Sequence, residues 1–374
     1  MREDTEKAFF ALLRAGLWEK EIRLSFYGEI DFSAVLDLAE EQSVVGLVAA
    51  GIEHVADMKP AKMDVLQFVA RTVQIEQQNQ MMNQFIAELV EKMREAGIYT
   101  VLVKGQGIAQ CYERPLWRAC GDVDFFLNDE NYVAAKAFLA LKAESVDLES
   151  GKHLGMTVDS WTVELHGNLH CGLSSKMDSL IDKVQKDVFG EDKVRPWLNG
   201  ETQIFLPAVN EDVILIFTHF LKHFYKGGIG LRQICDWCRL LYTCKDSLNY
   251  GLLESRIQEM GLMTEWKAFG VFAVECLGMD AAAMPFYSDA VKWKRKASRI
   301  KSFVMSVGNM GHNRGSWLTE HGSWLGRQYV VRKAFSMFRR FGDLINHARI
   351  FPLDSLRFFP RIMWNGIVSA VKGE

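Results

Sequence analysis

The spacing of apolar residues divides the chain into three parts. Residues 4–56 and the segment from Pro60 to Gly97 carry apolar side chains three and four positions apart, as in helices that bury one face. Short alternating runs between helical segments follow, and the helical spacing returns from Asn210 onward. The pattern predicts an α+β protein with a small mixed sheet flanked by N-terminal and C-terminal helical regions. The expected domains are residues 1–97, 98–207 and 208–374.

The segment from Pro60 to Gly97 is expected to form one helix with an apolar stripe along its whole length. Gly97 favours a helix stop at that position. The polar middle, Glu76 to Gln80, is interpreted as a solvated face, with a partner-binding face as the alternative. The predicted stripe consists of Leu66, Val69, Val73, Met82, Phe85, Leu89 and Met93.

Two acidic residues stand on a predicted buried strand in the middle part. A first strand is predicted from Ile98 to Val103, and after a Lys-Gly-Gln turn and a short helix over residues 107–113 a second strand is predicted over residues 120–127. Because side chains alternate along a strand, Asp122 and Asp124 share one face while their apolar neighbours face the core. Two carboxylates so placed are costly unless a cation lies between them. A divalent metal is the simplest such cation.

A third carboxylate stands on another alternating run, Trp161 to His166, in which Glu164 and His166 share a face. If this strand pairs beside the strand of Asp122 and Asp124, facing Cβ atoms come within roughly 4.5–5.5 Å. Three carboxylates could then share metal ions. Oxygen ligands of this kind suit Mg²⁺, which fills its other positions with water and substrate phosphates. Phosphoryl or nucleotidyl transfer is therefore the leading hypothesis.

The middle part carries the series Lys104-Gly105, Tyr112, Pro115, Arg118, Gly121-Asp122-Val123-Asp124 and Glu164-Leu165-His166. This series resembles the uncharacterised nucleotidyltransferase family of the DNA polymerase beta-like superfamily. In that superfamily a glycine-containing turn, two acids on the next strand and a third acid on a later strand form the active site. The resemblance implies that Asp122, Asp124 and Glu164 are catalytic and bind metal, with two Mg²⁺ ions expected.

The resemblance also implies nucleotide contacts at the turn and beside the acids. Lys104, Gly105, Gln106 and Arg118 are the expected nucleotide-binding residues. Gly105 would let the backbone approach phosphate groups. Lys104 and Arg118 would hold a triphosphate, one as a point charge and the other as a two-pronged donor. The alternative for both cations is that they only neutralise the acids of the neighbouring strand.

Further polar residues, one of them on the strand of Glu164, also match positions of the family. His219 and His223 stand four residues apart on one face of a predicted helix, which is the spacing of a possible metal pair. For the residues of this helix and the next, the favoured interpretation is a buried polar network that ties the helical region to the catalytic domain, with direct substrate contact as the alternative. The candidates for substrate binding are His153, His166, His219, His223, Arg232 and Asp236.

Two further motifs favour structural roles. Cys235 and Cys238 have the spacing of zinc ligands, but a single pair of this kind is more typical of core cysteines on a helix. The cluster Gly308-Asn309-Met310-Gly311 is interpreted as a turn, with a loop that closes over substrate as the alternative.

The C-terminal part combines basic and aromatic residues. Between Arg327 and Arg361 basic residues outnumber acids and alternate with phenylalanines, and Lys292 to Lys296 forms a second basic run. A basic solvated face on helices whose aromatic residues fill the core is the favoured interpretation. The alternative is a surface for peripheral contact with a membrane or for nucleic acid.

Composition and charge narrow the class of protein. A chain of 374 residues, 49% of them hydrophobic, can bury a large core, and a net charge of −3 predicts no stable nucleic-acid partner. The seven cysteines lack framework spacing and the first residues are charged, so cytoplasmic localisation is expected. No apolar run reaches the roughly 18 to 20 residues of a membrane span.

The sequence therefore predicts an Mg²⁺-dependent nucleotidyltransferase that moves a nucleoside monophosphate from an NTP to an acceptor hydroxyl and releases pyrophosphate. The acceptor stays open between a sugar, a small molecule, a protein and RNA, and the base of the NTP is open too. One alternative is a non-catalytic scaffold that binds nucleotide or a membrane surface. A third is a metal-dependent hydrolase, because the same carboxylates could activate water.

Overall fold

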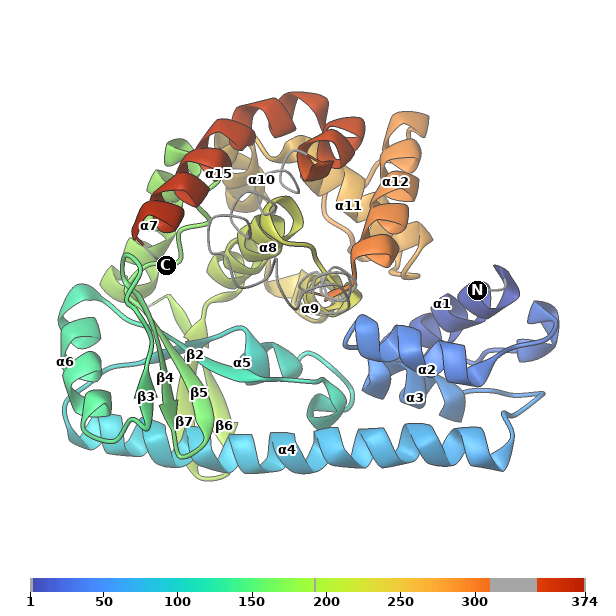
Figure 1. Ribbon diagram of the computed structural model, residues 1–374, viewed down its shortest axis with the longest axis horizontal. Helices are drawn as coiled ribbons and strands as arrows, with labels where there is room; N and C mark the ends of the chain where they lie inside the picture. The colour runs from blue at the N-terminus through green and yellow to red at the C-terminus, as the bar shows by residue number, and fades with distance from the viewer. Residues whose placement is uncertain (1–2, 192, 310–341, 373–374) are drawn as a thin grey trace, which may run out of the picture.

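A mixed five-stranded sheet lies at one end of the molecule, and helices surround it (Figure 1). The computed structural model describes residues 3–191, 193–309 and 342–372. The strands of the sheet are β1 Val101–Val103, β2 Asp122–Phe126, β3 Ser145–Val146, β4 His153–Val158 and β5 Trp161–His166. Their order is β1-β2-β5-β4-β3, and of the four pairings only that of β2 with β5 is parallel. The predicted α+β class with a small mixed sheet is confirmed.

Helices make up most of the rest of the described chain. A hairpin of β6 Val194–Asn199 and β7 Thr202–Pro207 packs beside β1. Short 3₁₀ helices of the described ranges include η1 Leu24–Tyr27, η2 Pro115–Trp117, η3 Lys245–Ser247 and η4 Ala281–Ala283. The α-helices include α1 Glu3–Trp18, α2 Phe32–Glu41, α3 Val45–Glu53, α4 Lys62–Glu95, α5 Gly105–Ala109, α6 Asp129–Ala140, α7 Ser175–Gly190, α8 Val209–Lys226, α9 Leu231–Thr243, α10 Tyr250–Met260, α11 Met263–Glu275, α12 Val291–Val307 and α15 Pro352–Lys372, and residues 342–350 are also helical.

The register between β2 and β5 brings the acids together. Asp124 lies opposite Glu164, and Val123 lies opposite Val163. Val123 and Val163 are buried in one hydrophobic cluster with residues of α4 and α6, so these two helices cover the apolar face of the sheet. The acids occupy the other face because side chains alternate along each strand.

The long helix α4 passes under both the sheet and helices α1 to α3 (Figure 1), and Gly97 follows it with a φ of +73°. The predicted stripe is confirmed in its second half, where Met82, Phe85, Leu89 and Met93 are buried. It is wrong in its first half, where Leu66, Val69 and Val73 are 50%, 47% and 43% exposed.

The buried face of α4 in its first half carries polar residues. Thr72 and Asn79 are buried and satisfy their side chains by hydrogen bonds, Thr72 to the carbonyl of Phe68 and Asn79 to the carbonyls of Leu116 and Arg118. Buried polar groups are tolerated when they are hydrogen-bonded in this way. The polar middle of the helix is therefore solvated at its glutamines, and the interpretation of Asn79 as solvated is wrong.

An aromatic core holds the helical half together. Phe217 and Phe220 of α8, Trp237 of α9, and Trp266 and Phe269 of α11 are fully buried. Their rings meet edge to face or tilted, with centroids 4.7 to 5.6 Å apart in the closest pairs. Such contacts add to the large apolar area that aromatic residues bury. This core fixes α8 and α9, the two helices that face the acids of the sheet.

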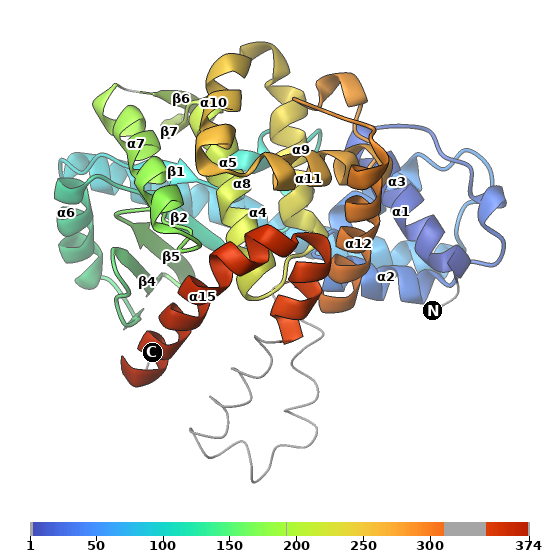
Figure 2. The same cartoon turned by 90° about the horizontal axis from the view of Figure 1, so that it is seen from above.

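Helix α15 crosses the molecule from the region of α12 to α7 (Figure 2). In the middle of this helix Arg361 pairs with Asp178 of α7 at 2.7 Å. Phe351 and Phe358 are fully buried, which agrees with the favoured interpretation that aromatic residues of this region fill the core. Residues 327–341 of the predicted basic and aromatic surface lie outside the described residues. None of the helices in the described ranges has both the length and the apolar composition of a membrane span.

Candidate metal and nucleotide site

Three carboxylates converge on the polar face of the sheet. Asp122 and Asp124 of β2 and Glu164 of β5 each offer an oxygen, and these oxygens all lie within 4.8 Å of one another. Asp124 is buried, whereas Asp122 and Glu164 are partly exposed. The repulsion of Asp124, together with burial, raises the pKa of Asp122. The arrangement is therefore electrostatically unfavourable without a nearby cation, and a hard divalent ion such as Mg²⁺ fits this donor set.

Lys104 supplies positive charge to the acids from the end of β1. Its Nζ donates a hydrogen bond to Oδ1 of Asp124 at 2.6 Å. Burial would lower the pKa of Lys104, but attraction to Asp124 and Glu164 outweighs burial and raises it. The structure thus contains the direct contact that is expected if Lys104 neutralises the acids.

The backbone turns sharply at Lys104 and Gly105, which have φ angles of +58° and +37°. A Cβ added to Gly105 would lie 3.1 Å from the Sγ of Cys120 and would be strained by the positive φ. The glycine therefore allows the turn to pass close to the strand that carries the acids.

The side chain of Gln106 contacts α4. Its Nε2 donates to Oδ1 of Asn79 at 2.7 Å, and the side chain is buried. Asn79 in turn holds the chain at Leu116 and Arg118, just before β2. The buried amides thus connect the turn after β1 and the approach to β2 with the long helix.

Arg118 pairs with Asp236 of α9, and neither acid of β2 is its partner. Its Nε and one terminal nitrogen contact the two oxygens of Asp236 at 3.1 and 2.6 Å. The hydroxyl of Tyr112 donates to the same carboxylate at 2.8 Å. All three side chains are buried. A buried polar network of this kind is the favoured interpretation of Asp236 from the sequence, and here it connects α9 to the segment that leads into β2.

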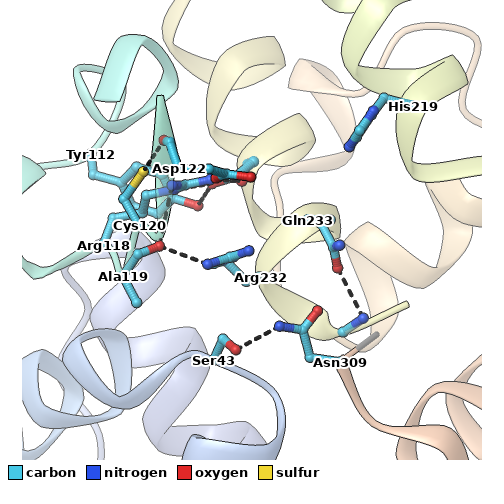
Figure 3. Close-up of polar contacts among 12 residues, drawn as sticks. Ser43, Tyr112, Arg118, Ala119, Cys120, Asp122, His219, Arg232, Gln233 and Asn309 are labelled. Atoms are coloured by element: carbon cyan, nitrogen blue, oxygen red, sulfur yellow. Dashed lines mark hydrogen bonds and ion pairs between the residues drawn. The ribbon is translucent and has the colours of Figure 1, made fainter. Parts of the chain in front are cut away.

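Arg232, at the start of α9, lies close to the acids without a carboxylate partner among the described residues (Figure 3). One terminal nitrogen donates to the carbonyl of Ala119 at 2.9 Å, while its buried Nε has no partner in the described structure. Burial and the charge of Arg118 lower the pKa of Arg232. A guanidinium in this position retains donor capacity for an anion.

Two histidines flank Glu164. Nε2 of His153, on β4, lies 3.1 Å from Oε2 of Glu164, and Nε2 of His166, on β5, lies 3.3 Å from the same oxygen. Nε2 of His166 also lies 2.7 Å from Oδ1 of Asp124. Although burial opposes ionisation, the hydrogen bonds of the two histidines lower the pKa of Glu164 well below its usual value.

His219 and His223 approach from α8, and Figure 3 shows His219 projecting from that helix on the side of Asp122. Their Nε2 atoms are 3.1 Å apart. Burial and the charge of Lys104 lower the pKa of His219 well below its usual value. Burial and the charge of Lys222 lower the pKa of His223 to about 4. Both imidazoles are therefore neutral at neutral pH.

Lys222, between these histidines, was not singled out by sequence reasoning. It has no hydrogen bond or ion pair within the described residues, and it lies within electrostatic reach of Glu164 and Asp124. Burial and the charge of Lys104 lower the pKa of Lys222. Lys222 follows Thr218 by four residues and His219 by three, so in a helix these side chains share a face. This spacing could have identified Lys222 as a residue of the face toward the sheet.

The two remaining motifs are the cysteine pair and the cluster that begins at Gly308. Cys235 and Cys238 are fully buried in the helical core, and burial raises the pKa of both thiols, as expected for core cysteines. Gly308 ends α12 with a φ of +71°, and Asn309 donates to Oγ of Ser43 at 2.7 Å (Figure 3). Met310 and Gly311 lie outside the described residues.

Comparison with known proteins agrees with this geometry. The chain belongs to the family of uncharacterised nucleotidyltransferases, whose sequence profile matches residues 28–278. The match covers the sheet, the three carboxylates and helices α8 and α9. No curated protein and no solved structure matches the chain significantly.

We predict that Asp236→Ala destabilises the protein by about 3–5 kcal/mol, because it leaves the buried guanidinium of Arg118 without its partner. Tyr112→Phe, which removes one hydrogen bond to the same carboxylate, is expected to cost about 1 kcal/mol. Urea unfolding measures both. A loss below about 1 kcal/mol for Asp236→Ala would show that the network does not hold α9 in place. The double variant Arg118→Met with Asp236→Leu should recover part of the loss.

A second prediction concerns acid. Because the folded protein binds a proton on His223 only near pH 4 while the unfolded chain binds it near pH 6.5, the unfolded state holds more protons between these values. Stability should therefore fall as the pH is lowered from about 7 to about 4. In His223→Asn the free energy of unfolding should depend less steeply on pH. The difference in slope should correspond to at most about one bound proton. His54→Asn, on the far side of the molecule at the end of α3, is the control. An identical pH slope in wild type and His223→Asn would contradict the prediction.

Proposed function

We propose that this protein transfers a nucleoside monophosphate from an NTP to an acceptor hydroxyl. The acceptor oxygen forms a bond to the α-phosphorus, the bond between the α-phosphorus and the bridging oxygen breaks, pyrophosphate leaves, and the hydroxyl proton passes to a base. The observation that carries the proposal is the group of Asp122, Asp124 and Glu164 on one face of paired strands in a chain of the nucleotidyltransferase family.

Asp122, Asp124 and Glu164 would hold divalent metal, for which Mg²⁺ is the first candidate. When bound, the metal offsets the negative charge of the triphosphate and polarises the phosphoryl group. The partly exposed Glu164 can meet the acceptor hydroxyl, whereas the buried Asp124 is fixed by Lys104 and His166. Asp124 therefore positions metal, and Glu164 is the carboxylate that also orients the acceptor.

The triphosphate would be bound by groups that the sheet and the helices bring to this face. The turn at Gly105 lets the backbone approach phosphate oxygens. Lys222 and Arg232 have free donor capacity within the described structure. Arg118, whose Nε and one terminal nitrogen both bind Asp236, positions α9 and so places Arg232. Charged donors of this kind stabilise the charge that develops on a leaving pyrophosphate.

The direct test is incubation of the pure protein with Mg²⁺ and each NTP labelled with ³²P at the α-position, alone and with host lysate. Transfer of label by the wild type and not by Asp122→Asn with Asp124→Asn would support the proposal, and the labelled species would identify the acceptor class. Nucleotide binding without transfer from any NTP would reject it in favour of the binding scaffold.

We predict that Asp122→Asn lowers the rate of label transfer at least about a hundredfold, because metal-ion catalysis supplies several kcal/mol of transition-state stabilisation. The same change removes repulsion from Asp124, so the free energy of unfolding should stay equal or rise. Single-turnover kinetics and urea unfolding measure the two effects. Retained transfer, or loss of transfer only through unfolding, would contradict the assigned role.

We also predict that Lys222→Ala weakens binding of the Mg²⁺–NTP complex at least about tenfold, because hydrogen bonds to charged groups contribute about 1.5–3 kcal/mol. The matched control is Lys183→Ala, which removes an exposed lysine of α7 that contacts Glu259 at 3.9 Å. Titration with a fluorescent NTP analogue measures both. Equal affinities of wild type and Lys222→Ala would remove Lys222 from the triphosphate site.

A further inference from the structure

The imidazoles of His153 and His166 converge on a single carboxylate oxygen. Their Nε2 atoms lie 3.1 and 3.3 Å from Oε2 of Glu164. Their rings stack with centroids 4.7 Å apart and an interplanar angle of 22°. To orient a carboxylate, one imidazole N–H is sufficient. Nε2 of His166 also lies 2.7 Å from Oδ1 of Asp124. The two ring nitrogens and the carboxylate oxygen between them are of the types that bind transition ions.

The positions of these three residues follow from the sheet. His153 of β4 lies opposite His166 of β5, and Glu164 shares the face of His166 two residues earlier. All three side chains therefore project from two adjacent, hydrogen-bonded strands and need no loop to bring them together. His166 is buried, while His153 is 45% exposed and leaves a path from solvent.

The separations match a small coordination polyhedron. Zinc-like ions bind imidazole nitrogen and carboxylate oxygen at about 2.0–2.1 Å in tetrahedral sites, which places neighbouring ligand atoms about 3.3 Å apart. The two nitrogens lie 3.1 and 3.3 Å from the carboxylate oxygen, and the three ligand atoms all lie within 4.8 Å of one another. The distances thus suit direct ligation with little movement of the strands.

We propose that His153, His166 and Glu164 bind a divalent transition ion of the class that prefers imidazole, such as Zn²⁺ or Co²⁺. Glu164 also belongs to the carboxylate group with Asp122 and Asp124, so the site adjoins the Mg²⁺ site and shares one ligand with it. Imidazole suits transition ions, whereas carboxylate and water suit Mg²⁺. The second of the two expected ions is then not Mg²⁺. This inference deepens the proposed function, but its test does not require nucleotidyl transfer.

The test is a titration of metal-stripped full-length protein with Co²⁺, because the visible absorption of Co²⁺ reports nitrogen ligation and a low coordination number. Wild type should bind one Co²⁺ with these bands, Zn²⁺ should displace it, and millimolar Mg²⁺ should not. His153→Gln should weaken binding at least about tenfold and remove the bands. Glu164→Gln should weaken binding of Co²⁺ and of Mg²⁺.

Two controls separate this site from its surroundings. Asp122→Asn should retain the Co²⁺ bands, because Asp122 belongs only to the carboxylate group. His170→Gln should also retain them, since His170 contacts a carboxylate, Asp182 at 2.6 Å, outside the group. His153 is half-exposed, so its variant tests the site even if a change at the buried His166 impairs folding.

The outcomes decide the inference separately from the proposed function. Absence of Co²⁺ binding to wild type, unchanged bands in His153→Gln, or displacement by equimolar Mg²⁺ would each overturn the imidazole site. The wild type could also bind Co²⁺ through its imidazoles and yet transfer no label from any NTP. That result would support the metal site and would reject only the proposed nucleotidyl transfer.

Discussion

The structure depends on one electrostatic constraint, the placement of Asp124 directly beside Glu164 by the parallel pairing of β2 and β5. With Asp122 two residues away, three carboxylates share one surface, on which Asp124 is buried and the other two are partly exposed. Such a group is unfavourable unless positive charge or hydrogen-bond donors surround it. Lys104 at the end of β1 and His166 on β5 both contact the most buried of the three carboxylates. The local backbone, including the positive φ at Lys104, places these partners.

The helical half completes the site. Helices α8 and α9 face the acids because an aromatic core holds them together, and the pair of Arg118 with Asp236 joins α9 to the segment before β2. This arrangement positions Lys222 and Arg232 near the carboxylates. A small sheet alone has little surface for a nucleotide and an acceptor. The helices therefore supply the charge and surface that the sheet lacks.

Sequence reasoning succeeded where the pattern is local. Alternation along β2 and β5 placed the three acids on shared faces, and the helical spacing of α8 placed His219 beside His223. It failed where a distant partner decides. The first half of α4 buries Thr72 and Asn79. Thr72 donates its hydrogen bond to a carbonyl of the same helix, and Asn79 donates to a carbonyl of the distant segment before β2. The partner of Arg118 and the position of Lys222 depend on how α8 and α9 dock on the sheet, which no local pattern records. The division into three domains stays a prediction.

The most direct test of the central claim is a crystal structure with Mn²⁺ and an NTP analogue that cannot be cleaved between its α- and β-phosphates. The account predicts an anomalous peak for Mn²⁺ among Asp122, Asp124 and Glu164, with the triphosphate between the turn at Gly105 and α8. A nucleotide bound elsewhere, or carboxylates that hold no Mn²⁺ in the presence of the analogue, would contradict it.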